Sequence, residues 1–130
     1  MLIDNSILDS NIIIYATKPQ FDYLRTFIEE NSPVISAVSY VEVLGYHKLN
    51  EPEKTLLIQF FDASEILEVS MEIIEKAVIL RQTKKMTLGD SLIAATTLVH
   101  NLTLITNNTK DFDWVDGIKL FNPLVELSAK

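Results

Sequence analysis

Leu102-Thr103-Leu104-Ile105-Thr106 is the clearest β-strand in the sequence, because β-branched and aliphatic residues follow one another there without a charge. An Ala- and Leu-rich segment at residues 88–101 precedes this strand and has the composition of a helix, with Thr87 as its N-cap. A last short strand is predicted at residues 118–121. The C-terminal part of the chain thus runs from a helix into a strand and on to a second strand.

The rest of the chain shows the same alternation. Strands are predicted up to Asp9 and at residues 34–35 and 66–69. Helices are predicted around residues 21–28, from Ser36 to about Leu49, from Pro52 onward, and from Ser70 to the basic segment 81–85. This alternation predicts an α/β fold with a mainly parallel central sheet flanked by helices, in which ligands gather at the carboxyl ends of the strands.

Length and composition limit the kinds of site that the chain can form. The 130 residues suit one domain, residues 1–130, without a linker or a repeat. Because there is no cysteine and only His47 and His100 supply imidazole, a metal ion must be bound mainly through oxygen. The formal net charge of −7 argues against a protein that coats nucleic acid, but a nuclease whose carboxylates are neutralised by a cation remains compatible with it.

The N-terminus does not resemble a signal peptide, because Asp4 and Asp9 stand where a basic run is required. The longest unbroken apolar stretch, residues 12–16, is too short to span a bilayer. We therefore expect a cytoplasmic protein that does not contact a membrane.

Three carboxylates stand among apolar neighbours, where an unpaired charge is costly. Asp9 follows Ile7-Leu8 and precedes Ile12-Ile13-Ile14. Glu42 lies within the helix predicted from Ser36 and has no basic residue within reach on that helix. Asp90 lies in the first turn of the helix at residues 88–101. The pattern predicts an interior position for all three.

Two of these acids also have a structural interpretation. Asp9 suits the N-cap of a short helix, and Asp90 suits a capping box with Thr87, where the helix dipole favours an anion. If the three acids converge instead, their repulsion raises their pKa values unless a cation lies among them. Oxygen ligands without thiolates suit Mg²⁺ or Mn²⁺, and the corresponding chemistry is metal-assisted hydrolysis of a phosphodiester.

Segments spread over nearly the whole chain resemble the PIN-domain ribonucleases, in particular the VapC and FitB toxins of type II toxin–antitoxin pairs. The order and spacing of the segments carry the resemblance, since each alone is common. They are residues 8–15 around Asp9, residues 35–44 around Glu42, residues 88–95 around Asp90, and residues 102–112 followed by residues 120–123. The resemblance implies a three-layer α/β/α fold.

The resemblance also implies roles for individual residues. Asp9, Glu42 and Asp90 fall on the family's catalytic, metal-binding acids, with Mg²⁺ as the expected cofactor and Mn²⁺ as a substitute. Asn108 stands where the family often has a fourth acid, and it brings an oxygen but no charge. Thr106 matches the family's strand-end threonine but also suits an ordinary strand. Asp111 suits either a water-mediated site role or a structural role in a turn.

By this resemblance, the chain is expected to be an endoribonuclease that leaves 5′-phosphate and 3′-hydroxyl ends. The implied partners are an RNA substrate, a cognate antitoxin and a second copy of the chain in a homodimer. Five basic residues lie near the site in sequence and flank the expected RNA path, although ordinary solvated lysines fit the pattern equally well: Lys18, Arg81, Lys84, Lys85 and Lys110.

Three alternatives remain at this stage. A signalling receiver domain requires an acceptor aspartate at the end of a middle strand, but those strands end at Ser36 and Ser70. A haloacid-dehalogenase-like phosphatase requires a second acid at Asn11. The third is a PIN-like module that binds RNA or protein with weak catalysis or none, which the uncharged Asn108 favours.

Overall fold

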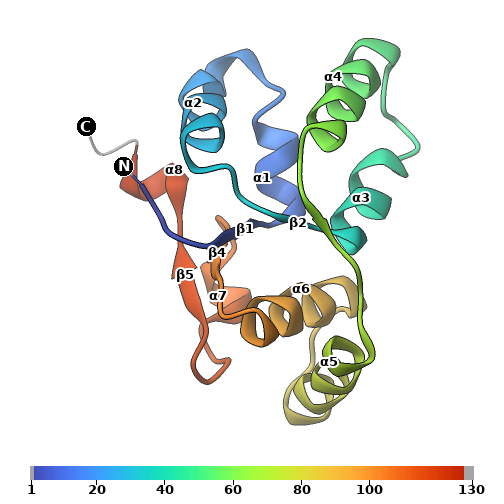
Figure 1. Ribbon diagram of the computed structural model, residues 1–130, viewed down its shortest axis with the longest axis vertical. Coiled ribbons are helices and arrows are strands. Elements are labelled where there is room, and N and C mark those ends of the chain that lie inside the picture. Colours follow the sequence, from blue (N-terminus) through green and yellow to red (C-terminus); the bar gives the residue numbers. More distant parts are fainter. Residues whose placement is uncertain (1, 128–130) are drawn as a thin grey trace.

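The computed structural model describes residues 2–127 and shows a parallel sheet between two layers of helices (Figure 1). The predicted domain range of 1–130 includes Met1 and residues 128–130, which lie outside the described residues. The α/β/α arrangement confirms the fold class expected from the sequence.

The strands form two hydrogen-bonded groups that a single bridge connects. The first group has the order β1 (Ser6–Leu8), β4 (Thr103–Ile105), β5 (Lys119–Phe121), and the second pairs β2 (Ile35–Ser36) with β3 (Ile66–Leu67). All of these pairs are parallel. Ile7 of β1 bridges Val34 beside β2, so the spatial order is β3-β2-β1-β4-β5, with β1 and β4 near the centre.

Helices cover both faces of this sheet. The bounds are α1 (Ser10–Tyr15), η1 (Pro19–Phe21), α2 (Asp22–Asn31), α3 (Ala37–Leu44), α4 (Glu51–Asp62), α5 (Met71–Thr83), α6 (Leu88–Val99), α7 (Thr109–Phe112) and α8 (Pro123–Glu126). In Figure 1, α1 to α4 lie on one side of the strands and α5 to α7 on the other.

Alternate residues of the central strands supply the two hydrophobic cores. Leu8 and Ile105 belong to the core under α1 to α4, together with Ile12, Phe27 and Phe61. Their strand neighbours Ile7 and Leu104 belong to the core under α5 to α7, together with Ile73, Ala94 and Phe112. Successive side chains of a strand point to opposite faces, so Ile7-Leu8 and Leu104-Ile105 each supply one residue to either core.

Several predicted boundaries were wrong by a few residues. The helix predicted to reach Leu49 ends at Leu44, because Gly45 caps it and glycine favours a helix end over a helix interior. The helix predicted to reach residue 101 ends at Val99, since Asn101 has a positive φ of 52°. The predicted strand at residues 66–69 is ordered as a strand only at Ile66–Leu67.

Polar side chains cap most of the longer helices as the sequence predicted. Ser36, Ser70 and Thr87 each accept a hydrogen bond from a backbone N–H in the first turn of α3, α5 and α6. Asn50 and Glu53 form a capping box at the start of α4, which the sequence analysis did not predict. No helix in residues 2–127 has the length and apolar composition needed to cross a bilayer.

Candidate active site

Asp9 lies at the carboxyl end of β1, in the middle of the sheet. Its side chain is only 5% exposed, and it caps α1 by accepting a hydrogen bond from the Ser10 N–H at 2.9 Å. The Thr106 hydroxyl, at the end of neighbouring β4, donates to the second carboxylate oxygen at 2.7 Å. Asp9 therefore does cap α1, as one interpretation of the sequence expected. Its carboxylate is also buried at the carboxyl end of the sheet, where ligands bind in α/β proteins.

Burial raises the pKa of the Asp9 carboxyl to about 6. The hydrogen bonds from Thr106 and from the Ser10 N–H lower it, while the negative charges of Asp90 and Glu42 raise it. Desolvation therefore outweighs two good hydrogen bonds, as expected for a buried carboxylate whose charged neighbours, among the described residues, are other acids.

Ser10 connects Asp9 to Glu42. The Ser10 hydroxyl donates to Oε1 of Glu42 at 2.6 Å, and the hydroxyl oxygens of Ser10 and Ser39 lie 2.9 Å apart. The expected interior position of Glu42 was wrong, because the residue is exposed on α3. Its carboxylate is nevertheless fixed by Ser10, one residue after the buried Asp9.

Gly89 makes the close approach of α3 and α6 possible. A Cβ atom at Gly89 would lie 2.4 Å from Oε2 of Glu42, closer than nonbonded atoms approach. The Glu42 carboxylate therefore packs against the first turn of α6, directly beside Asp90.

Asp90 is half-buried, so its expected interior position is correct only in part. Burial raises the pKa of its carboxyl, the charges of Asp111 and Glu42 raise it further, and the hydrogen bond with the Thr87 side chain lowers it. The Thr87 hydroxyl also accepts a hydrogen bond from the Asp90 N–H at 3.1 Å. Asp90 thus has a capping neighbour and also faces two other acids.

The three acids influence one another electrostatically and form no ion pair in the part of the chain that the structure describes. Asp90 and Glu42 raise the pKa of Asp9, and Glu42 raises that of Asp90. The ion pairs found in residues 2–127 lie elsewhere and join Lys18 to Glu53 and Arg25 to Asp22. In the same residues, no group of three or more acids or histidines is close enough to enclose a metal ion as the side chains stand. The acids are linked through Ser10 and Gly89 but do not form a closed ligand cage in the described residues.

Thr106 and Asn108 extend the site along the loop after β4. The fully buried Thr106 hydroxyl accepts from the Asn108 N–H at 3.0 Å while it donates to Asp9. The Asn108 side chain makes no capping hydrogen bond to α7. Asp111, exposed in α7, acts on Asp90 through its charge and accepts from the Trp114 indole N–H through its backbone carbonyl at 3.0 Å.

Sequence reasoning missed three residues of this region. Ser10 directly follows Asp9, and Gly89 directly precedes Asp90. Their position next to an acid in the sequence was the only available signal. Asn107 carries a buried side-chain oxygen without a hydrogen-bond partner in the described residues, and no sequence pattern distinguished it from Asn108.

The fold and site define a class of small α/β/α proteins with acidic residues near the carboxyl edge of a parallel sheet. The sequence model of the PIN domain matches residues 6–118, and the chain belongs to this family. The resemblance seen in the sequence is thereby confirmed at the level of the family.

Solved structures similar to this chain come from toxin–antitoxin complexes. One is titled a toxin-antitoxin complex from Klebsiella pneumoniae, with a TM-score of 0.73, 30% identity, and coverage of 92% of this chain and 98% of that chain. A second is FitAcB from Neisseria gonorrhoeae, with a TM-score of 0.72, 26% identity, and coverage of 96% and 99%. A third is VapBC2 from Rickettsia felis bound to a promoter DNA fragment, with a TM-score of 0.74, 25% identity, and coverage of 94% and 98%. No curated protein sequence matches the chain.

Proposed function

We propose that the protein is a Mg²⁺- or Mn²⁺-dependent endoribonuclease of the VapC and FitB type, acting in the cytoplasm as the toxin of a type II toxin–antitoxin pair. One observation carries the proposal. The buried Asp9 carboxylate has a raised pKa, to which the charges of Asp90 and Glu42 contribute, and it forms no ion pair within residues 2–127. A site that accumulates negative charge in this way gains free energy when a divalent cation binds.

The donor set suits a hard cation. Asp9, Glu42 and Asp90 would hold it, since carboxylate oxygens are the ligands that Mg²⁺ accepts, and Asn108 and Asp111 would act through water. When bound, such an ion lowers the pKa of a coordinated water and stabilises charge on the phosphate. The open arrangement of the acids leaves positions for water and for phosphate oxygens.

The chain's own residues orient these oxygens. Thr106 and the Ser10 N–H hold the two oxygens of Asp9, and the Ser10 hydroxyl holds Oε1 of Glu42. Each hydrogen bond reduces the reorganisation needed when a cation enters. The buried surroundings of Asp9 also strengthen its attraction for a positive charge.

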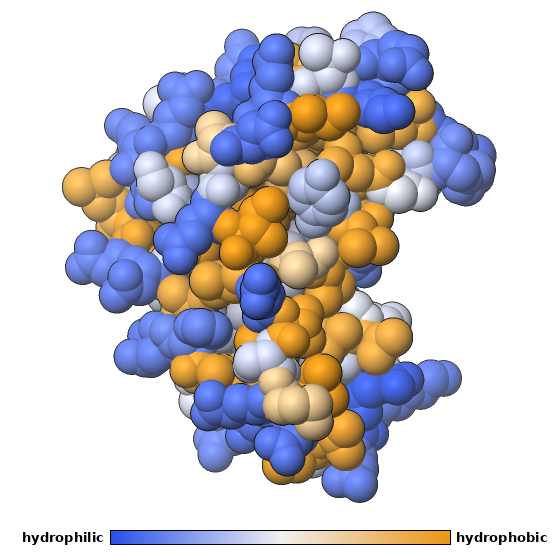
Figure 2. All heavy atoms as spheres, turned by 45° about the vertical axis from the view of Figure 1, so that its right-hand side comes forward, coloured by the Kyte–Doolittle hydropathy of each residue, from blue (hydrophilic) through white to orange (hydrophobic). Residues whose placement is uncertain are grey.

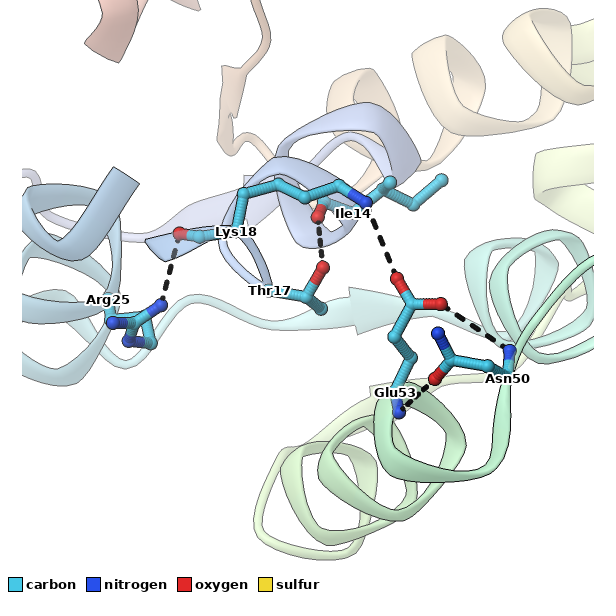
Figure 3. A network of polar contacts seen from close by, with 6 residues as sticks. All are labelled: Ile14, Thr17, Lys18, Arg25, Asn50 and Glu53. Carbon is cyan, nitrogen blue, oxygen red and sulfur yellow. Dashed lines mark hydrogen bonds and ion pairs between the residues drawn. The ribbon is translucent and has the colours of Figure 1, made fainter. Parts of the chain in front are cut away.

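An antitoxin partner is supported by an apolar groove. A cavity of about 510 Å³ opens between α1, α2 and α4, and its lining includes Ile13, Ile28, Leu56, Leu57 and Phe60. Figure 3 shows the polar contacts beside it, where Lys18 pairs with Glu53 at 3.3 Å and Arg25 donates to the Lys18 carbonyl. An apolar segment of an antitoxin would fill this groove, and the similar structures named above come from toxin–antitoxin complexes.

A homodimer is supported by exposed apolar residues on α3 and α5. Tyr40 and Val41 on α3, and Val78 and Ile79 on α5, are large and exposed in the single chain. Figure 2 turns the side of α3 and α5 toward the viewer and shows apolar side chains gathered around a hollow in this face. A second copy would remove this surface from water.

A PIN-like module with weak catalysis or none is the second candidate. The uncharged Asn108 and the absence of a closed ligand cage in residues 2–127 favour it. Metal binding and catalysis separate the two candidates.

Purified protein is incubated with total RNA in Mg²⁺, in Mn²⁺ and with EDTA. We expect cleavage that chelation abolishes, with 5′-phosphate ends. Asp9→Asn abolishes cleavage while circular dichroism shows an intact fold, and Glu42→Gln and Asp90→Asn lose metal affinity by calorimetric titration. Cleavage that continues unchanged in Asp9→Asn overturns the proposal, and RNA binding without any cleavage supports the binding module.

A further inference from the structure

A second cavity adjoins the acidic site on the side of α5 to α7. Its volume is about 590 Å³, within the range of small-ligand pockets, and Asp90 and Asp111 form part of its wall. Four basic side chains, Arg81, Lys84, Lys85 and Lys110, line the rest together with Met86, Thr87 and Trp114. We call this the basic pocket.

The charge of the basic pocket differs from that of the molecule. The chain has 11 basic and 18 acidic residues, so a surface chosen at random is acidic on balance. Four of those basic residues converge on this cavity, against two acids. They come from the last turn of α5, the link between α5 and α6, and α7, segments that only the fold brings together.

Trp114 gives the basic pocket a flat aromatic wall. The indole N–H donates to the Asp111 carbonyl at 3.0 Å, and part of the ring packs against the hydrophobic core. The Lys84 ammonium lies 5.6 Å from the ring centroid. The ring is thus held in one orientation, and a cation stands over its face.

A ligand for such a pocket needs negative charge and a planar ring together. A nucleotide has both, since a base stacks on an aromatic ring and its phosphate pairs with lysine or arginine. An acidic peptide would satisfy the charge but gain nothing from a planar wall. The pocket also continues into the wall formed by Asp90, so a chain bound there passes the acidic site.

We propose that the basic pocket binds one nucleotide of a single-stranded RNA next to the bond that is cut, with its base on Trp114 and its phosphate on Lys84 and Lys85. This inference rests on the proposed ribonuclease function and adds to it the residues that select an unpaired strand. A paired base has no free face, so Trp114 favours single-stranded over duplex substrate.

Trp114 is the only tryptophan in the chain, so its fluorescence reports on this pocket alone. The protein is titrated in EDTA, where no cleavage is expected, with a 12-nucleotide single-stranded RNA of random sequence carrying a 3′ dye. Anisotropy of the dye reports total binding. We expect tryptophan fluorescence to be quenched in parallel with the rise in anisotropy. Binding that leaves Trp114 fluorescence unchanged overturns the proposal.

Variants then separate stacking from charge. Trp114→Leu weakens binding by about 10-fold and Trp114→Phe by much less, because phenylalanine keeps an aromatic face while both lose the indole N–H. Lys84→Gln with Lys85→Gln lowers the magnitude of the slope of log affinity against log salt by roughly 0.7, the value for the one phosphate that both lysines contact on a single strand. The matched control, Lys48→Gln with Lys54→Gln, removes the same charge at exposed positions outside the pocket. This control should lower the slope less than the pocket double variant does. Equal effects of the two double variants overturn the proposal.

Cleavage in Mg²⁺ distinguishes failure here from failure of the proposed function. If the basic pocket is right, Trp114→Leu cuts single-stranded RNA about 10-fold more slowly at subsaturating substrate and loses its preference over duplex. Normal cleavage and preference in this variant refute the nucleotide pocket while the ribonuclease stands. If the pocket variants instead weaken binding of a protein partner and not of RNA, the pocket is a protein interface and the proposal fails. No cleavage and no binding of any RNA by the wild type refutes both.

Discussion

Replacing Asp9 with asparagine should stabilise the metal-free protein at neutral pH. The substitution removes the negative charge of a carboxylate whose two oxygens both accept hydrogen bonds. The pKa of the Asp9 carboxyl rises from 3.8 to about 6 on folding. The folded protein therefore binds this proton more tightly than the unfolded chain does. Stability from this group is complete below pH 3.8 and is lost as the pH rises through about 6.

The size of the effect follows from the shift. A difference of about 2 pKa units at about 1.4 kcal/mol each gives roughly 3 kcal/mol of destabilisation by the ionised carboxylate above pH 7. Asparagine removes this charge but accepts only one of the two hydrogen bonds from Thr106 and Ser10, which costs about 1 kcal/mol. We therefore expect Asp9→Asn to unfold with a free energy about 2 kcal/mol higher than the wild type at pH 7.5 in EDTA.

Urea denaturation followed by circular dichroism measures this difference. At pH 7.5 the variant should be the more stable protein, and the difference should shrink as the pH falls from 6 toward 4. Excess Mg²⁺ should then stabilise the wild type and leave the variant unchanged, because ligand binding to the folded state adds stability. Asp4→Asn, at an exposed position, serves as the control and should show neither effect. If Asp9→Asn is less stable than the wild type by the same amount at every pH, Asp9 is a helix cap and not a stored charge.

Of three further predictions, two concern residues around the acids and one concerns the apolar groove. Gly89→Ala places a methyl group 2.4 Å from the present position of Oε2 of Glu42, so the Glu42 side chain must move. Calorimetry should then show about 10-fold weaker Mg²⁺ binding, while the helix content of α6 stays intact. Thr106→Val removes a hydrogen bond that lowers the pKa of Asp9, so the pH profile of cleavage should shift to higher pH. Thr97→Val is the control, because Thr97 is equally buried but donates to the Ile93 carbonyl, and it should not shift the profile. Leu56→Glu places a charge in the apolar groove at an exposed position, and we expect at least 10-fold weaker antitoxin binding by surface plasmon resonance, with cleavage of RNA unchanged.

Local sequence signals accounted for the α/β class with a parallel sheet and for most helix starts, whereas the three-layer order was implied by the family resemblance. Ser36, Ser70 and Thr87 predicted their helices because an N-cap is a contact over two or three residues. Helix ends were predicted less well: α3 ends at Leu44, although Gly45 was a local signal for that end, and α6 ends at Val99, shortly before the positive φ of Asn101.

The acids of the site show the same division. Asp9 was correctly expected to be buried, because it follows a strand whose neighbours on both sides are apolar. Glu42 was expected inside and lies exposed, because helical spacing gives the face of α3 but not which part of that face another element covers. The roles of all three acids in metal binding remain predictions for the experiments above.

The sequence alone determined that this chain alternates strands with helices and that Asp9 follows a buried strand, because both properties depend on neighbours within one turn or one strand. Only the tertiary structure decided that Ser10 bonds Glu42, that Gly89 admits the Glu42 carboxylate beside Asp90, and that Trp114 lies beneath Lys84, which follows α5. These contacts join residues far apart in the chain, and their geometry is set by how the helices pack on the sheet and not by any local pattern.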